Sequence, residues 1–245
     1  MQKGFTLSEL LLSLFIVGVV AVLSVPVLLN NVNNKTFATQ IKNMSATIEQ
    51  LAQDQMVLHK TRDLNNTDFA DPETLVNDNN FLIVKSCTNP TSDDSIKNCW
   101  KTKSGVEGRV KYKKLSGGDY SSTQGGLPTL ETARRGSSAI LKNGATIKYM
   151  LASSTSISNV PEDVIGYFVV DVNGSDKPNI IGRDLFGFYI TRKGKVIGGG
   201  IETPSHTTLG WKKSHCRGED NSNSIKVREA WCYEYLLSNS WNMDY

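Results

Sequence analysis

The most prominent pattern in the sequence is an apolar run near its beginning. From residue 10 to residue 29 only Ser13, Gly18, Ser24 and Pro26 interrupt a series of hydrophobic side chains. A helix of about 20 apolar residues is long enough to cross the hydrocarbon core of a bilayer. The run therefore predicts a membrane-spanning helix.

A second pattern follows over residues 30–60. Residues recur there at alternating steps of four and three, which places them on one stripe of an α-helix. The stripe consists of Phe37, Ile41, Met44, Ile48, Leu51, Gln55 and Leu58, and only Gln55 among them is polar. A coiled coil is an alternative, although the stripe is short for one. We expect this helix to lie on a sheet and to continue the apolar run as one bent spine of roughly 55 residues.

Beyond the spine, the pattern becomes that of short strands. Asn143-Gly144 and Lys193-Gly194 each lie between two apolar runs, which is typical of β-hairpins. Residues 81–87 predict a short strand or a helix end, and residues 164–172 predict a strand. These segments together predict an antiparallel sheet of about four or five strands.

Loops and one further helix complete the predicted fold. Residues 61–71 and 116–126 have the composition of loops, and residues 224–241 have helical spacing. The fold class is therefore α+β: a long N-terminal α-helical spine, first transmembrane and then amphipathic, packed on a small antiparallel β-sheet head with long loops.

Composition and charge change this picture little. The chain has 245 residues, a formal net charge of +3 and 39% hydrophobic residues. A net charge this small predicts neither nucleic-acid binding nor an acidic partner. Arg134-Arg135 and the basic residues of 111–114 are interpreted as solvated surface, so a nucleic-acid partner is not expected.

The four cysteines form two local pairs, Cys87 with Cys99 and Cys216 with Cys232. An even number of cysteines in local pairs fits disulfides in an oxidising compartment. We favour these pairings among the three possible connectivities because each closes a short loop. A zinc site is the alternative, and the lack of a C-x-x-C motif in the sequence counts against it.

The residues before the apolar run distinguish its possible roles. An ordinary secretory signal needs a basic n-region, a shorter apolar stretch and a small-x-small cleavage site. A simple membrane anchor explains the length of the run but gives no reason for the acid at Glu9. The stretch KGFTLSE, residues 3–9, followed by an apolar helix, resembles the class III signal of type IV pilins and type II secretion pseudopilins.

The resemblance implies a processing site. In that family a prepilin peptidase cuts after the glycine and N-methylates the new first residue, which implies cleavage after Gly4 and methylation of Phe5. The family's glutamate falls at Glu9, and its helix-bending proline falls at Pro26.

Pattern and resemblance together divide the chain into four parts. These are a leader peptide over residues 1–4, a transmembrane and filament-core helix over 5–29, an amphipathic helix over 30–60, and a globular C-terminal head over 61–245.

The resemblance also implies a structural role and a set of partners. The chain would be a fimbrial pilin or pseudopilin, not an enzyme, polymerised through its N-terminal helix with other subunits. Further implied partners are the prepilin peptidase, an inner-membrane assembly platform, a traffic ATPase and, in a Gram-negative host, a secretin. The subunit would cross the inner membrane once with its head outside the cytoplasm, and then enter a cell-surface filament or a periplasmic pseudopilus. The alternative is a membrane-anchored extracellular binding module or enzyme with a class III leader.

Elementary electrostatics gives Glu9 a role of its own. A carboxylate in lipid is costly, so Glu9 should be paired. Cleavage after Gly4 creates an α-amine at Phe5, and the amine of a neighbouring subunit could pair with Glu9 and set the axial register. The alternative is a side chain that reaches the headgroups. Pro26 cannot donate to the carbonyl of Val22, so we expect the helix to bend or melt locally there.

One loop offers a set of oxygen ligands. Asp171, Asn173 and Asp176 lie at short spacing, Gly174 permits a tight turn, and Asp184 could return as a fourth ligand. Calcium binds such oxygens, although the bidentate Glu that ends an EF-hand loop is missing. Pseudopilin heads often carry a calcium loop, so the resemblance favours calcium, though no cofactor is required. The alternative is an Asx-turn loop, in which these side chains hydrogen-bond to their own backbone.

Little in the sequence suggests catalysis. His206, His215 and Cys216 could bind a metal or form a Cys–His nucleophile. No orienting acid stands in a recognisable context, and Cys216 is better used in a disulfide. Ser137 and Ser138 lie in no G-x-S-x-G motif, and the sequence has no P-loop motif. We therefore expect no catalytic residues.

Overall fold

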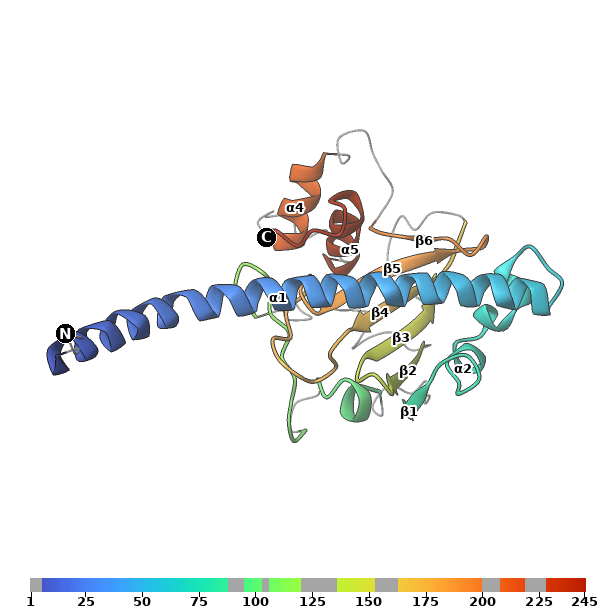
Figure 1. The fold of residues 1–245 in the computed structure, drawn as a ribbon. Helices are drawn as coiled ribbons and strands as arrows, with labels where there is room; N and C mark the ends of the chain where they lie inside the picture. Colours follow the sequence, from blue (N-terminus) through green and yellow to red (C-terminus); the bar gives the residue numbers. More distant parts are fainter. Residues whose placement is uncertain are drawn as a thin grey trace. The chain divides into compact units, whose positions relative to one another are not determined.

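The structure is a computed structural model with an α+β architecture, as the sequence predicts: one long N-terminal helix and a six-stranded antiparallel sheet (Figure 1). It describes residues 6–87, 95–102, 106–119, 136–152, 163–199, 208–218 and 228–245. The chain divides into two compact units, Met1–Thr36 and Phe37–Tyr245.

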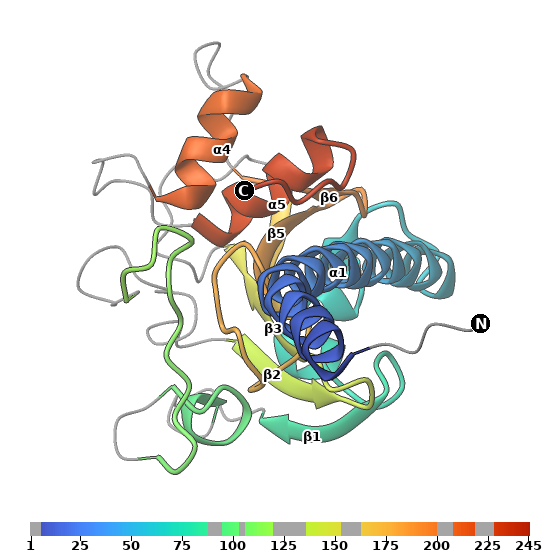
Figure 2. The same ribbon diagram turned by 60° about the vertical axis from the view of Figure 1, so that its left-hand side comes forward.

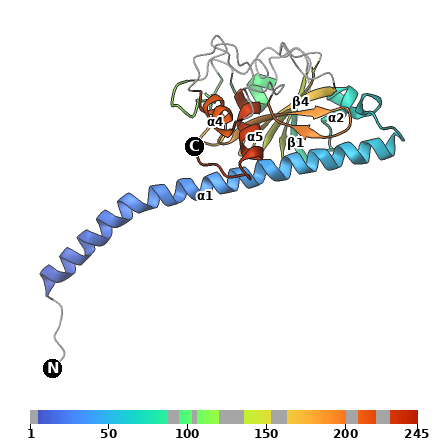
Figure 3. The same cartoon turned by 90° about the horizontal axis from the view of Figure 1, so that it is seen from above.

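The predicted spine is a single helix, α1, that spans Leu7–Leu58 (Figure 3). Its 52 residues are close to the expected length. We expected the helix to bend or melt locally at Pro26; α1 continues through this residue, so local melting does not occur. Proline removes one hydrogen bond from the helix, and the remaining turns hold. The hydroxyl of Ser24, two residues earlier, donates to the carbonyl of Val20 at 2.6 Å.

The second half of α1 buries the predicted stripe. Phe37 and Met44 are each 9% exposed, and Ile41 and Ile48 are fully buried. Gln55, the polar member of the stripe, is buried as well. Leu58 is exposed because α1 ends there. The period of the pattern therefore identified the core face of this half of the helix.

The sheet has its strands in chain order, β1-β2-β3-β4-β5-β6, each antiparallel to the next (Figure 2). The strands are β1 (Ile83–Cys87), β2 (Gly136–Leu141), β3 (Thr146–Leu151), β4 (Val164–Asp171), β5 (Leu185–Thr191) and β6 (Val196–Ile197). The expected number was four or five, and the difference lies at the edges of the sheet. There β1 has a register shift and β6 has only two residues.

Both predicted hairpin turns are confirmed. Gly144 connects β2 to β3 with a φ of 87°, and Gly194 connects β5 to β6 with a φ of 77°. Residues with a side chain rarely adopt such angles, which is why glycine occurs at both turns. The backbone N–H of Ala145 donates to Oδ1 of Asn143 at 3.1 Å and fixes the first turn.

Aromatic side chains form the centre of the core on one face of the sheet. The ring centroids of Tyr149 and Phe168 lie 4.6 Å apart, and those of Phe168 and Phe188 lie 5.6 Å apart. The row therefore crosses β3, β4 and β5 and reaches Tyr233 beyond the sheet, 5.0 Å from Phe188. Such contacts stabilise a core beyond simple burial of area.

Short helices occur within and just after residues 61–71, the segment that composition assigns to a loop. Within the segment lie η1 (Leu64–Asn66) and η2 (Asp68–Ala70), and α2 (Pro72–Leu75) follows directly. Each begins at a polar cap, because the side chains of Asp63, Thr67 and Asp71 accept hydrogen bonds from the first backbone N–H groups. They are too short to produce a hydrophobic period that the sequence could reveal.

Two helices follow the sheet. The predicted C-terminal helix is α5 (Arg228–Ser238), and α4 (Leu209–Arg217) was not predicted. The caps of α4 are nevertheless recognisable in the sequence. Thr208 accepts a hydrogen bond from the N–H of Trp211, and Gly218 ends the helix with a φ of 79°.

Candidate functional site

The N-terminal end of α1 carries the processing motif, and its first turn has a specific hydrogen-bonding pattern. The backbone N–H and the hydroxyl of Thr6 each donate to Oε2 of Glu9 at 2.8 Å. In return, the N–H of Glu9 donates to Oγ1 of Thr6 at 3.3 Å. This reciprocal arrangement is a capping box, with Thr6 as the N-cap and Glu9 three residues later.

The capping box gives Glu9 partners within its own helix. Its carboxylate is turned back toward the beginning of α1, where the positive end of the helix dipole favours an acid. This role was not predicted from the sequence, although the T-x-x-E spacing of Thr6 and Glu9 is its signature. Gly4 and Phe5, the predicted cleavage and methylation positions, lie outside the described residues.

The apolar part of α1 exposes its hydrophobic side chains all round. An 18-residue window of the helix has the hydropathy of a membrane span and is 0% buried within the chain. Leu14, Phe15 and Leu23, for example, are 65–71% exposed. Such a surface is stable only in lipid or against other apolar helices. Among the described residues this is the one candidate membrane span.

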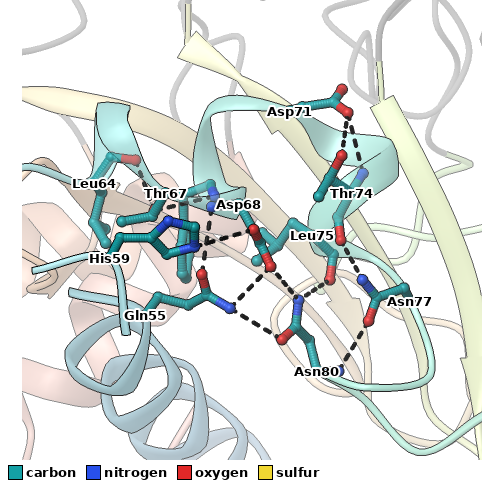
Figure 4. A network of polar contacts seen from close by, with 11 residues as sticks. Gln55, His59, Leu64, Thr67, Asp68, Asp71, Thr74, Leu75, Asn77 and Asn80 are labelled. Atoms are coloured by element: carbon teal, nitrogen blue, oxygen red, sulfur yellow. Dashed lines mark hydrogen bonds and ion pairs between the residues drawn. The ribbon is translucent and has the colours of Figure 1, made fainter. Parts of the chain in front are cut away.

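The C-terminal end of α1 is held by a network of polar side chains (Figure 4). The amide of Gln55 donates to Oδ2 of Asp68 at 2.9 Å and to Oδ1 of Asn80 at 3.2 Å. Asn80 also donates to Asp68, and His59 lies 3.5 Å from the same carboxylate. Gln55 is therefore the polar member of an apolar stripe because it joins α1 to the segment that follows it.

Two disulfides are present, with the pairing favoured from the sequence. Cys87 at the end of β1 is bonded to Cys99 at the end of a helical turn, η3 (Ser95–Cys99). Cys216 of α4 is bonded to Cys232 of α5. Each bond closes a loop of 12 or 16 residues, so each restricts the unfolded chain by a similar amount.

The loop proposed as a calcium site is held by hydrogen bonds to its acids. Oδ2 of Asp171 accepts from the hydroxyl of Tyr112 at 2.5 Å, and Oδ1 accepts from the N–H of Asn173 at 3.2 Å. Both oxygens of Asp184 accept backbone N–H groups, from Asn179 and Ile180, at 2.6 Å. The bond from Asn173 to Asp171 has the Asx-turn geometry of the alternative interpretation.

The acids of this loop are buried together. Burial, followed by the charge of Asp184, raises the pKa of Asp171 well above its usual range. Burial raises the pKa of Asp184 to about 6, against the opposing effect of its backbone hydrogen bonds. Asp176, the third acid among the predicted ligands, is exposed.

These residues do not fit a calcium site as they stand. Calcium takes six to eight oxygen ligands. The four carboxylate oxygens of Asp171 and Asp184, however, already accept hydrogen bonds from N–H or O–H groups. The amide oxygens of Asn173 and Asn179 are the buried acceptors left without a hydrogen bond among the described residues of the loop. In the part of the chain that the structure describes, no group of three or more His, Cys, Asp or Glu residues could hold a metal.

Three of the other candidate residues, Cys216, His215 and Ser138, have structural partners. Cys216 is in a disulfide, and Nδ1 of His215 lies 2.9 Å from the carbonyl of Trp211. Ser137 and Ser138 are fully buried in β2, where Ser138 accepts from the indole N–H of Trp100 at 3.1 Å. His206 lies outside the described residues.

Comparison with known proteins identifies the N-terminal motif. Residues 1–25 match the family model described as the prokaryotic N-terminal methylation motif. No curated protein and no solved structure matches the chain significantly. The matched residues include Gly4, Phe5 and the capping pair Thr6 and Glu9. The chain therefore begins with the class III prepilin signal of type IV pilins and pseudopilins.

Proposed function

We propose that this protein is a structural subunit of a type IV pilus or a type II secretion pseudopilus. A prepilin peptidase cleaves it after Gly4 and methylates Phe5. Separate machinery, comprising an assembly platform and a traffic ATPase, then polymerises it with other subunits through α1. The head remains outside the cytoplasm throughout.

The observation that carries this proposal is the combination of the methylation motif with a fully exposed apolar helix. The motif covers residues 1–25, and the apolar window of α1 buries none of its surface within the chain. A membrane anchor needs only the apolar helix, whereas a filament subunit needs both the processing signal and an apolar surface that can move from lipid into a bundle of helices. Helices in a bundle retain the same apolar contacts that lipid supplies.

In this bundle, the charge of Glu9 fixes the axial position of each subunit relative to its neighbour. Apolar packing alone allows neighbouring helices many axial offsets. A buried charge pair forms at only one of these offsets. After cleavage, the amine of Phe5 lies next in sequence to Thr6, which already donates two hydrogen bonds to Glu9. The carboxylate of one subunit is thus held at the helix end, where it can meet the amine of its neighbour.

Because Glu9 takes part in a capping box, two substitutions can separate its charge from its capping role. Glu9→Leu removes the cap and the charge, whereas Glu9→Gln removes the charge and retains a side chain that can complete a capping box. If the charge sets the register, both variants are processed normally and both fail to enter filaments. The measurement is the fraction of processed subunit recovered in sheared filaments. Normal incorporation of Glu9→Gln would assign Glu9 to capping alone and contradict the register role.

A further inference from the structure

Acidic and basic residues are unevenly distributed along the unit that begins at Phe37. Residues 63–84 contain five acids and no Lys, Arg or His. Four of these acids, Asp68, Asp71, Glu73 and Asp78, lie within residues 68–78. We call residues 68–78 the acidic segment. Glu73 and Asp78 are exposed, and neither has an ion pair or side-chain hydrogen bond among the described residues.

A group of cations lies near the end of α1. We call Lys60, Arg62, Arg192, Lys193 and Lys195 the basic cluster; all five are exposed, and none has a side-chain partner among the described residues. Two segments of the chain are brought together here. The N–H of Leu64 donates to the carbonyl of Arg192 at 3.0 Å, which ties the end of α1 to the β5–β6 turn.

The two charged groups lie on different sides of the second half of α1. Gln40, Asn43 and Thr47 line a groove with residues 80–82, which directly follow the acidic segment. Glu49, Gln50 and Gln53 instead line a depression with residues 193–195 of the basic cluster. Helix α2 and the β5–β6 turn also lie on either side of α1 in Figure 1.

Each side also presents apolar surface. Leu82 and Val84, next to the acidic segment, are both 68% exposed. Val57 and Leu58, next to the basic cluster, are 78% and 71% exposed. Each side also carries charges of the opposite sign: Lys142 lines the groove on the acidic side, Glu49 lines the depression on the basic side, and Asp63 directly follows Arg62.

Local structure explains only part of this arrangement. Lys60 and Arg62 follow the C-terminal end of α1, whose last turn contains no basic residue, and the negative end of the helix dipole favours cations there. Asp71 caps α2, and Asp68 accepts from Gln55. Glu73 lies in the first turn of α2, where the positive end of the helix dipole favours an acid. No such local role accounts for Asp78.

We propose that the acidic side of one subunit docks on the basic side of the next copy. This inference rests on the proposed function and names the contact between heads. The two surfaces are different patches of one chain, so the contact is heterologous and can repeat indefinitely, as a filament requires. The charges select the orientation of docking, and the apolar residues beside them supply buried area.

Charge reversal tests this contact in cells that assemble the full-length protein. The acidic variant is Glu73→Lys with Asp78→Lys, and the basic variant is Lys193→Glu with Lys195→Glu. Each should lower the yield of sheared filaments by about tenfold, because like charges then face each other. The variant with all four substitutions restores opposite charges and should recover a yield close to that of the wild type.

Matched controls carry the same charge changes elsewhere. They are Glu107→Lys with Asp119→Lys, and Lys111→Glu with Lys113→Glu, all at exposed positions. These controls should assemble normally. Loss of yield that the fourfold variant does not recover would indicate a folding defect and overturn the contact.

The outcomes also separate this contact from the proposed function. If the wild-type protein forms filaments and both charge-reversal variants give normal filament yields, the contact is overturned and the proposed function stands. A wild-type protein that is processed but never found in filaments would overturn the proposed function and the contact with it.

Discussion

The side-chain amide of Gln55 donates a hydrogen bond of 2.9 Å to the carboxylate of Asp68, across 13 residues of sequence. Gln55 occupies an apolar position of the α1 stripe and is 4% exposed. A buried amide is tolerated only when its hydrogen bonds are made. This contact fixes the point at which the chain leaves α1 and enters η1, η2 and α2.

Gln55→Leu tests this relationship. The substitution completes the apolar stripe, so the pattern alone predicts stabilisation. We expect instead a loss of about 1–3 kcal/mol in the free energy of unfolding, because Asp68 and Asn80 lose a partner. Denaturant unfolding of the detergent-solubilised full chain measures the change. Gln53→Leu, at an exposed position of the same helix, is the control and should change little. A Gln55→Leu protein as stable as the wild type would show that the network is dispensable.

Much of this fold could be predicted from the sequence, and Gln55 shows where that prediction ends. The stripe of α1 and the two glycine turns are local patterns with a fixed period or a required φ, so the sequence reveals them directly. Helix α4 has clear caps at Thr208 and Gly218 but a polar surface pattern, and it was missed. The partners of Gln55 come from residues 68 and 80, and no local pattern predicts a contact at that separation.

In the candidate site, too, the local patterns could be predicted from the sequence and the long-range contacts could not. The processing motif is a contiguous string, and it could be recognised in full. The acids Asp171 and Asp184 were interpreted as possible calcium ligands, because the donors that hydrogen-bond to them could not be predicted from the sequence. One of these donors, the hydroxyl of Tyr112, lies 59 residues away from Asp171.

The buried acid Asp184 predicts a specific pH dependence. Its folded pKa is raised to about 6, above that of the unfolded chain, so the folded state binds the proton more tightly. The stabilising contribution of this proton is complete below about pH 4 and is lost as the pH rises through about 6. Relative to the wild type, Asp184→Asn should therefore gain up to about 3 kcal/mol between about pH 4 and pH 7.

Unfolding curves of both proteins at several pH values measure this difference. Asp176→Asn, in the same loop but exposed, is the control and should follow the wild type. A constant difference between Asp184→Asn and the wild type would show that the carboxyl titrates normally in the folded state.

The hydrogen bonds of the same loop predict its response to calcium. Because donors occupy the oxygens of Asp171 and Asp184, millimolar calcium should leave the melting temperature of the full chain unchanged. Magnesium at the same concentration controls for ionic strength. A calcium-specific rise of several degrees would show that the loop rearranges to bind the ion, since a ligand that binds only the folded state stabilises it.

The two disulfides should contribute similarly to stability. Replacing either cysteine pair by serine removes the constraint on a short loop and should lower the free energy of unfolding by about 3 kcal/mol. The comparison is Cys87→Ser with Cys99→Ser against Cys216→Ser with Cys232→Ser. Unfolding of each double variant under identical conditions measures the loss. Unchanged stability in either would indicate that its cysteines are not bonded in the native protein.

The mature N-terminus of the protein in isolated filaments tests the central claim most directly. Filaments sheared from cells are digested, and the N-terminal peptide is identified by mass spectrometry. The proposed function predicts a chain that begins at N-methylated Phe5 and retains Glu9 and the whole of α1. A chain that retains Met1, or one cut near Leu29, would contradict it.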